Sequence, residues 1–474
     1  MLINKGKYKH MKRVKNKNTK KSVMTDPNKN ENKIDGKSVK KLFTLRRTIV
    51  LVLVIAAMLI GAFVYSSRPT EIDKLTENYV DTLKPSIVRE NVPTTFEDVY
   101  KAADSTFYGE TLSMFGNAYD SDSDTMDPFM GKPLVLHNIE TGKEYNFTFS
   151  GSADNAIPLG QLDEGVYEIY IYDQYTKKRV YFDKKTETEP FYTMRRNGKV
   201  KSITLEADQD LFRKYNTGLD KNYAFLVVKD TIPKSNVIDV IIDPSGNLLN
   251  VWSQELETGY ASDTIKEADA SLELAEKVKS ELEKYGLKVI IDRDADSTPG
   301  YYGADGRVGQ GYDHQAKVFL SLSMCDLDAV SRPFFMVSPL TNASLANEMA
   351  FVMNENGIQL DYPYTSTDLL ASGVVFDTQI VDNEYNVTNY TLEPALRESG
   401  GKVTFAGQYN QIGNAEYSDR FGMYGVIFDY ANVNSQDSIN YFNENKDTIA
   451  RSLAQGIAAY YQLQEVNENE TSGK

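Results

Sequence analysis

The sequence predicts one transmembrane helix followed by two folded regions: an antiparallel β-sandwich, then an α/β domain with a mainly parallel sheet and helices on both faces. Three observations support this fold class. Apolar strands alternate with amphipathic helices over residues 236–464, short strands rich in Tyr, Val and Ile fill residues 105–232, and an uncharged run occupies residues 48–65. The length of 474 residues also exceeds that of one ordinary domain.

The uncharged run, Thr48–Tyr65, has 18 residues and is near the lower length limit for a helix that crosses a bilayer. A buried core helix is disfavoured because the run is apolar on every face. A cleaved signal peptide is disfavoured because a long segment precedes the run and no small-residue cleavage site follows it. Residues 1–47 contain sixteen Lys or Arg and three acidic residues, so this tail should be disordered and cytoplasmic, with the C-terminal part outside the membrane.

The rest of the chain holds 36 basic and 64 acidic residues, a formal balance of −28. An acidic surface of this kind argues against nucleic acid as a partner. Cys325 is the only cysteine, so no intramolecular disulfide can form, and a large secreted region without disulfides suits a bacterium better than a eukaryotic cell surface. These features predict a single-pass protein of the cell membrane in a Gram-positive-type bacterium.

Residues 66–104 are predicted to be a stalk and residues 105–232 a β-sandwich. Tyr residues exposed on such a sandwich could stack on sugars. Alternating Tyr also suits a half-buried strand, and this is the interpretation that we favour. The strands are predicted at residues 133–137, 144–149, 166–172, 201–205 and 223–228.

The α/β domain is predicted to span residues 236–464, followed by a disordered tail at 465–474. In a helix predicted from Asp263 to Tyr285, apolar residues lie on one face and Gly286 provides a C-terminal stop. Because strands and helices alternate, ligands are expected at the carboxyl ends of the strands. The strands are predicted at 237–242, 287–291, 318–322, 334–337 and 424–428, and further helices near 308–316, at 344–354 and around 449–460.

The strand at 237–242 leads into Asp243-Pro244-Ser245-Gly246-Asn247. This segment resembles the opening motif of the zinc-dependent N-acetylmuramoyl-L-alanine amidases (the type 3 catalytic domain), in which an apolar strand runs into Asp-Pro-Gly-His-Gly-Gly. The resemblance covers roughly 230 residues and implies an amidase-like α/β fold that acts on peptidoglycan. Other segments that resemble the family, in the same order along the chain, are 272–275, 292–296, Arg307, 344–348 and 448–461.

The resemblance also assigns site positions, and most of them carry a residue that differs from the one in the family. The first zinc-binding His falls at Ser245 or Gly246, and the second falls at Ser323. The zinc-binding Glu falls at Asp269, with Glu267 as an alternative shifted by two residues, and the catalytic Glu falls at Asp429. Asp243, Arg293 and Arg307 are expected to line a possible groove together with Asp429.

A catalytic zinc ion typically needs imidazole ligands together with a carboxylate. The chain has three His: His10 in the tail, His137 in the predicted sandwich, and His314 before a strand rather than at its end. A site with two His and one carboxylate cannot be assembled from this domain. We therefore expect no zinc and no other cofactor, and Cys325 remains as an unusual candidate ligand.

Two functional hypotheses follow from the resemblance. The favoured one is a membrane-anchored pseudoamidase that binds peptidoglycan, or regulates a cell-envelope protein, without catalysis. The alternative is an active peptidoglycan hydrolase that cleaves the muramoyl-L-alanine amide bond with a rearranged site, either with zinc or with Asp243, Asp269 and Asp429 alone. A mechanism with paired carboxylates would need one raised and one low pKa at a suitable separation.

Overall fold

The computed structural model describes residues 95–117, 127–129, 131–139, 141–148, 158–210, 219–250, 253–303, 305–327, 330–338, 341, 343–361, 373–377, 393–405, 416–417 and 419–466. These residues all belong to one compact unit, Pro69–Lys474. The predicted cytoplasmic tail and the predicted span at 48–65 lie outside the described residues. Within the described ranges, no helix has both the length and the apolar character needed to cross a membrane.

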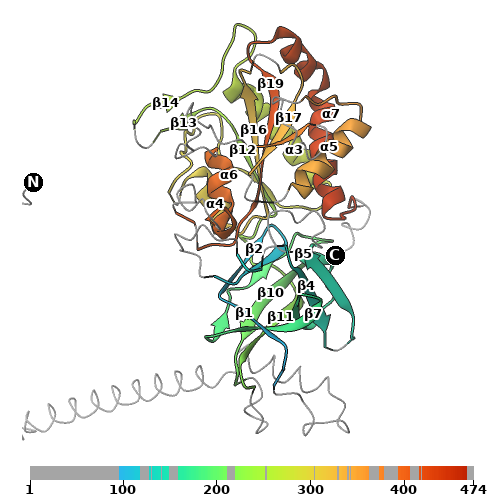
Figure 1. Ribbon diagram of the computed structural model, residues 1–474. Coiled ribbons are helices and arrows are strands. Elements are labelled where there is room, and N and C mark those ends of the chain that lie inside the picture. The colour runs from blue at the N-terminus through green and yellow to red at the C-terminus, as the bar shows by residue number, and fades with distance from the viewer. Residues whose placement is uncertain are drawn as a thin grey trace, which may run out of the picture. The chain divides into compact units, whose positions relative to one another are not determined.

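The C-terminal half contains a six-stranded sheet with the strand order β15-β12-β16-β19-β17-β18 (Figure 1). Four of its five strand pairs are parallel, and β17 runs antiparallel to β19. The prediction of a mainly parallel sheet in this domain is therefore confirmed. The strands are β12 (Val240–Pro244), β15 (Val289–Ile291), β16 (Val318–Cys325), β17 (Phe334–Val337), β18 (Val374–Phe376) and β19 (Tyr424–Asn432).

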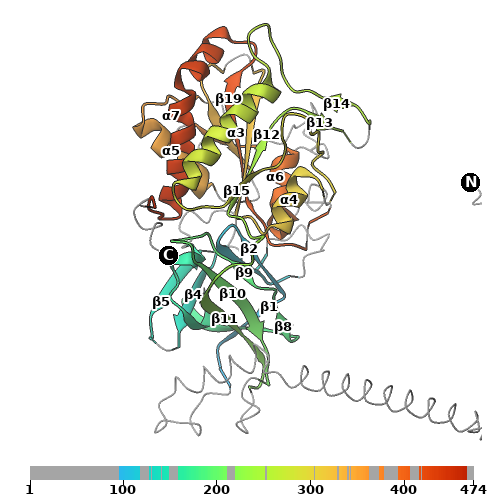
Figure 2. The same ribbon diagram turned by 180° about the vertical axis from the view of Figure 1, so that it is seen from behind.

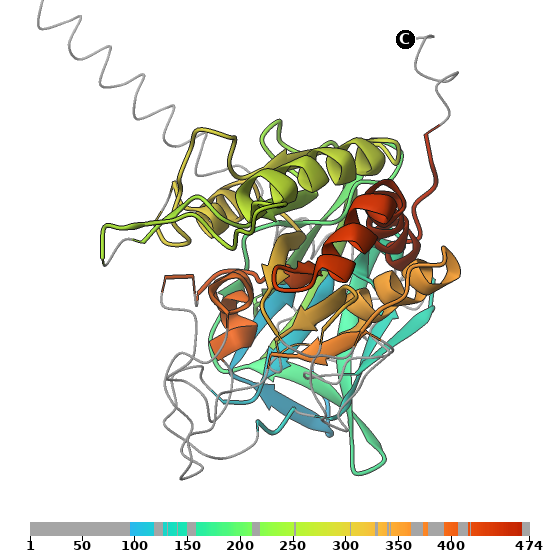
Figure 3. The ribbon, with the colours of Figure 1, turned by 90° about the horizontal axis from the view of Figure 1, so that it is seen from above.

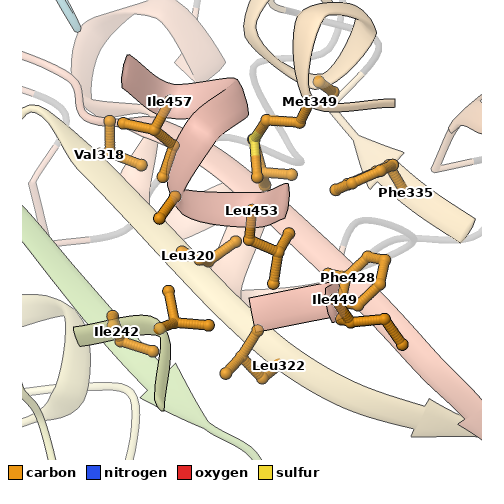
Figure 4. Close-up of a cluster of buried hydrophobic side chains, with 14 of the residues drawn as sticks. Ile242, Val318, Leu320, Leu322, Phe335, Met349, Phe428, Ile449, Leu453 and Ile457 are labelled. Atoms are coloured by element: carbon orange, nitrogen blue, oxygen red, sulfur yellow. The ribbon is translucent and has the colours of Figure 1, made fainter. Parts of the chain in front are cut away.

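Helices cover both faces of this sheet, as predicted. Val318, Leu320 and Leu322 alternate along β16 and pack on the face covered by the three longer helices, whereas Phe319 belongs to the opposite face (Figure 4). The views from behind and from above show α3, α5 and α7 together on one side of the sheet (Figures 2 and 3). That side holds α3 (Glu267–Glu283), α5 (Ser344–Glu355) and α7 (Gln436–Tyr460), and the other holds α4 (Arg307–Asp313) and α6 (Pro394–Ser399).

The N-terminal folded region differs from the predicted sandwich. Its strands pair mostly antiparallel, as expected, but nine of them form one continuous sheet, and β2 with β3 forms a separate ribbon. The sheet is continuous because β6 pairs with β11 along its first half and with β7 along its second half. The strands are β1 (Val99–Ala102), β2 (Asp104–Tyr108), β3 (Thr111–Phe115), β4 (Pro133–Asn138), β5 (Glu144–Thr148), β6 (Gly165–Asp173), β7 (Thr176–Phe182), β8 (Thr186–Glu187), β9 (Phe191–Tyr192), β10 (Val200–Ala207) and β11 (Asn222–Thr231).

The predicted boundary of the stalk also needs correction. The stalk was expected to run from residue 66 to residue 104, but β1 lies within this segment and pairs in parallel with β7. Ala102 at the end of β1 is fully buried in the core of the sheet region. Four residues are too few to display a periodicity in the sequence, so the strand is identifiable only by its partner.

The ribbon of β2 and β3 joins this region to the α/β domain. Gly109, in the turn of the ribbon, donates its N–H to Gly422 O at 2.8 Å, and Gly422 N donates to Phe107 O at 2.8 Å. The ring of Phe107 packs edge-on against Phe421 with 5.0 Å between the ring centroids. Backbone pairing and aromatic packing therefore continue from one region into the other.

A buried ion pair and a partly exposed one reinforce this joint. Arg195 Nε donates to the carboxylate of Asp239 at 3.0 Å, just before β12 begins, and both residues are at most 5% exposed. Arg196 pairs with Glu110 at 3.0 Å and also donates to Tyr461 O at 3.2 Å, after the end of α7. Because a charge buried without a partner is costly, these pairs hold the two regions in one arrangement.

Replacing Asp239 with Asn should lower the free energy of unfolding by about 3–5 kcal/mol, because the guanidinium of Arg195 would stay buried without a counter-charge. Unfolding by urea, followed by circular dichroism, measures this loss. The control is Asp183→Asn, which removes an ion pair with Lys101 whose side chains are 51% and 56% exposed, and which should cost less than about 1 kcal/mol. Equal losses in the two variants would contradict the role given to Asp239.

Candidate functional site

A pocket of about 490 Å³ opens at the carboxyl edge of the parallel strands β12, β16 and β19. Ligands of parallel α/β sheets ordinarily bind at this edge. The strand ends form its floor, and one wall is the hairpin of β13 (Leu248–Leu249) and β14 (Leu256–Glu257), which extends away from the sheet (Figure 1). The segment around Tyr301 and the start of α6 complete the lining.

Strand alternation turns Ser323 and Asp429 toward this pocket. Ser323 lies four residues after Phe319 in β16, and Asp429 lies two residues after Ile427 in β19, so both lie on the sheet face covered by α4 and α6. The register of the two strands pairs Ser323 directly with Asp429. The positions assigned to the second zinc His and to the catalytic Glu are therefore neighbours in the lining of the pocket.

Glu267, rather than Asp269, faces the pocket. Residues two apart in an α-helix point about 200° apart, so only one of these two side chains can reach the site. Glu267 is 2% exposed and lines the pocket, whereas Asp269 is exposed on the outer side of α3. The assignment of the family's acid to Asp269 is thus corrected, by position, to the alternative at Glu267.

The carboxylate of Glu267 accepts backbone hydrogen bonds at both oxygens. Met324 N donates to Oε1 at 2.8 Å, and Tyr260 N donates to Oε2 at 2.7 Å. Met324 follows an irregularity in the pairing of β16 with β19, where the register shifts after Ser323. A shift of this kind leaves a strand N–H without its usual partner, and Glu267 supplies the acceptor. Glu267 therefore ties the end of β16 to the loop that precedes α3.

Two buried arginines hold the loop that follows β12. Arg293 donates to Pro244 O at 2.7 Å and to Ser245 O at 2.7 Å. Arg307 donates to Pro244 O at 2.9 Å and to Gly246 O at 2.7 Å. A guanidinium offers five N–H donors in a fixed plane, so each arginine can satisfy several carbonyl groups at once. The backbone of the loop is fixed from the protein interior by these contacts.

Asp243 lies in the same buried layer. Its carboxylate accepts hydrogen bonds from Arg307 Nη1 at 2.7 Å and from Ser321 Oγ at 2.8 Å. Burial and the nearby charge of Asp243 raise the pKa of Asp292 well above its usual value. Asp243, Arg293 and Arg307 are buried beneath the pocket and are not part of its lining. The expectation that these three residues line the groove is therefore corrected, and only Asp429 of that set does so.

The two candidates for the first His position differ in the space available to them. Gly246 has φ +80°, and a Cβ atom there would lie 2.9 Å from Thr258 O and 3.0 Å from Ala268 Cα. A His side chain has no room at this position. Ser245 precedes it and also lines the pocket, so Ser245 is the position at which a longer side chain could point into the site.

The lining of the pocket is electrostatically unusual. Burial raises the pKa of Asp429 to about 7; the hydrogen bond from Ser323 lowers it, and the charges of Glu267 and Glu393 raise it further. The pKa of the Cys325 thiol rises to about 12 through burial and through the charge of Asp429. Cys325 is therefore a neutral thiol at physiological pH rather than a thiolate.

The residues present do not fit a catalytic zinc ion. Ser245 and Ser323 offer hydroxyl groups rather than imidazoles, each oxygen of Glu267 already accepts a backbone N–H, and the thiol of Cys325 is held in its neutral form. His314 lies at the end of α4, where Nδ1 contacts Asn236 O at 2.7 Å, and it is not part of the pocket lining. Within the described ranges, no group of three or more His, Cys, Asp or Glu could hold a metal ion.

Several lining residues had no signal in the sequence. Glu257 reaches the pocket from β14, Asp326 from the end of β16 and Glu393 from the start of α6, and Tyr260 and Tyr301 add aromatic rings. The Glu393-Pro394 pair indicates a helix start, which the structure has at α6, but not that this start adjoins Asp429. Only the tertiary fold brings these segments together.

Neither the known protein-family models nor the curated proteins include a match to this sequence. Solved structures similar to this chain include the catalytic domain of the N-acetylmuramoyl-L-alanine amidase CwlV from Bacillus (Paenibacillus) polymyxa var. colistinus, at 17% identity and a TM-score of 0.32, with 48% of this chain and 100% of that chain covered. Another is the amidase AmiC2 of Nostoc punctiforme, at 16% identity and a TM-score of 0.31, covering 48% and 99% of the two chains. A third is Ami1 from Mycobacterium smegmatis, at 16% identity and a TM-score of 0.32, covering 48% and 97%.

Replacing Gly246 with Ala should destabilise the protein more than replacing Gly198 with Ala. Both glycines have positive φ, +80° and +73°, so each substitution carries the backbone cost of about 1–2 kcal/mol. No atom lies within 4 Å of a Cβ at Gly198, whereas the Cβ at Gly246 meets Thr258 and Ala268, which should add about 1–3 kcal/mol. Unfolding by urea measures the free energy of unfolding of the two variants. Equal values would contradict the prediction, because they would show that the loop around Gly246 rearranges at no cost to admit a Cβ atom.

The raised pKa of Asp429 predicts a pH-dependent stability. Its native pKa of about 7 exceeds the unfolded value of about 4, so the stability that comes from its protonated form is fully present below pH 4 and is lost as the pH rises through 7. Asp429→Asn stays neutral and should show a smaller loss of unfolding free energy between pH 5 and pH 8 than the wild type. Asp263→Asn, at an exposed position, is the control and should behave as the wild type does. An unchanged pH dependence in Asp429→Asn would contradict the assignment.

Proposed function

We propose that this chain is a cell-envelope protein whose α/β domain is a non-catalytic relative of the N-acetylmuramoyl-L-alanine amidases and binds peptidoglycan. The observation that carries the proposal is the meeting of four positions in one pocket. The sequence resemblance assigns the zinc-ligand and catalytic positions of that family to Ser245 or Gly246, to Asp269 with Glu267 as an alternative, to Ser323 and to Asp429. Each of these residues except Asp269 lines the pocket. Ser323 and Asp429, which were assigned from the sequence alone, come from two strands that are far apart in the chain, so their pairing in the pocket supports the resemblance independently of any single motif.

The chemistry of the lining favours binding over catalysis. Serine at both His positions removes the imidazoles that would hold a metal ion and activate its water. Hydroxyl, carboxyl and phenol groups remain as hydrogen-bonding partners in a pocket of about 490 Å³, a size typical of ligand sites. A pocket with these groups suits a polar wall fragment that is held but not cut.

The N-terminal segment supports a location at the cell membrane. The basic residues before the run at 48–65 and the acidic balance after it fit one span, with the N-terminus in the cytoplasm and the C-terminal part outside. An extracytoplasmic domain of a single-pass protein in a Gram-positive-type bacterium would face peptidoglycan directly. The same location would also allow this chain to bind and regulate another protein of the cell envelope.

A specific observation also favours hydrolysis without a metal ion as a second candidate. Asp429 has a pKa of about 7 and is separated from the carboxylate of Glu267 by the hydroxyl of Ser323, which lies 3.3 Å from Glu267 Oε1. An acid with a pKa near the working pH beside a second carboxylate is suited to proton transfer. Asp243 and Asp269 cannot share this role, because one is buried in an ion pair with Arg307 and the other is exposed outside the pocket.

The full-length protein in detergent micelles should co-sediment with insoluble peptidoglycan and release neither new amino termini nor reducing ends, with or without added zinc. Gel analysis of the pellet measures binding, and chromatography of the supernatant measures hydrolysis. The replacement Ser323→Phe, which fills the pocket, should reduce co-sedimentation, whereas the exposed change Glu276→Gln should leave it unchanged.

Two results would overturn the proposal. Failure of the wild type to co-sediment would remove peptidoglycan as the ligand. Release of soluble wall fragments by the wild type, abolished in Asp429→Ala, would establish the second candidate function in place of the first.

A further inference from the structure

The pocket carries negative charge that no residue in its lining neutralises. Five carboxyl groups line it: Glu257, Glu267, Asp326, Glu393 and Asp429. None of the ion pairs formed within the described ranges includes any of the five. The described lining residues also include no Lys, Arg or His. Glu267 and Asp429 are buried, whereas Glu257, Asp326 and Glu393 are exposed. Buried carboxylates are ordinarily paired with a cation, so a ligand could supply the missing charge at the floor of the pocket.

Asp429 is one of the two buried carboxyl groups in this arrangement. It is 6% exposed, and the hydrogen-bonding group beside it is the hydroxyl of Ser323 rather than a cation. Tyr260, at the rim, lies near the same carboxyl groups. Burial raises the pKa of its phenol to about 12, and the charges of Asp326, Glu267 and Asp429 raise it further. The negative potential therefore extends from the rim to the floor.

The remaining walls are apolar and aromatic. Leu248 and Leu249 come from the hairpin, Phe334 and Met336 come from β17, and Tyr302 comes from the loop before α4. A hydrated metal ion gains nothing from walls of this kind, and the described carboxyl groups include no set that could hold a metal. An organic cation on an aliphatic chain matches both features, because its chain packs on the apolar walls while its charge meets the carboxylates.

We propose that the pocket recognises a primary ammonium group carried on an aliphatic chain, as in the side-chain amine of the diamino acid of a wall stem peptide. This inference rests on the proposed binding of peptidoglycan and names the part of the ligand that is recognised. Asp429 and Glu267 face the ammonium group from the floor of the pocket, and Glu257 and Asp326 face it from the rim. The neighbouring rings of Tyr260 and Tyr302 stack on its alkyl chain or face its charge.

Calorimetric titration of the full-length protein in detergent micelles tests the proposal with two synthetic tetrapeptides, L-Ala-D-γ-Glu-L-Lys-D-Ala and its Nε-acetyl derivative. Acetylation removes the charge and keeps the chain, so it should weaken binding by about tenfold or more. Asp429→Asn and Glu257→Gln should weaken binding of the free amine and leave binding of the acetylated peptide unchanged. The exposed change Glu276→Gln controls for the loss of one negative charge from the surface.

The pH dependence provides a second readout. Binding of the ammonium group favours the carboxylate form of Asp429, so affinity for the free amine should rise between pH 6 and pH 8 in the wild type. The rise should be smaller in Asp429→Asn, in which Glu393, whose carboxyl pKa is also raised by burial although the residue as a whole is exposed, still titrates. Equal affinity for the two peptides would overturn the inference, and so would an affinity that falls over this range.

Failure of this inference can be told apart from failure of the proposed function. Co-sedimentation with peptidoglycan together with equal binding of the two peptides would leave the wall ligand in place and remove the amine as the recognised group. Hexylamine and hexanol provide a probe that does not depend on the wall. Preference for hexylamine, lost in Asp429→Asn, would support recognition of the ammonium group even if peptidoglycan itself does not bind. Binding of Ca²⁺ at the same carboxyl groups, in place of the amine, would overturn it.

Discussion

The pocket depends on the way in which two buried arginines satisfy the carbonyl groups of the loop after β12. A buried carbonyl without a donor costs about 1–3 kcal/mol, and residues 244–246 present three of them at the edge of the sheet. Arg293 and Arg307 supply donors to all three, and the charge of Arg307 is balanced by Asp243. The position of Ser245 beside the pocket follows from this network. The loop is held by the protein's own side chains and requires no bound group.

Much of the α/β domain could be predicted because its signals are local. The strands β12 and β16 are apolar runs, and α3 and α7 carry apolar residues at helical spacing, so their existence and order follow from the sequence. The sequence does not show which residue in the first turn of α3 points inward. Glu267 and Asp269 are both acidic, and only the residue at which the helix starts decides between them. The single nine-stranded sheet could not be predicted either, since it depends on β6 changing partner from β11 to β7. The same limit applies to the pocket: Ser323 and Asp429 follow from strand alternation, whereas Glu257 on the hairpin and Glu393 before α6 are placed there only by the tertiary fold.

Glu267 shows why a residue at a ligand position does not by itself indicate a metal site. Its carboxylate is engaged by Met324 N and Tyr260 N, which lie in two different segments of the chain. A carboxylate that the sequence resemblance offered as a possible metal ligand is here a structural tie. The backbone irregularity after Ser323 requires an acceptor, whatever the chemistry of the pocket. Selection for folding alone could therefore retain an acid at this position.

The joint between the sheet region and the α/β domain has a mechanical consequence. Backbone pairing at Gly109 and Gly422, the buried pair Arg195–Asp239 and the hydrogen bond from Arg196 to Tyr461 O join the two regions directly. Tension applied at the N-terminal end of β1 is passed to the pocket through a continuous body. Because β1 runs parallel to β7 over four residue pairs, a pull along its axis shears their hydrogen bonds together instead of opening them one at a time. A force that enters at β1 is thus carried from the sheet region into the α/β domain.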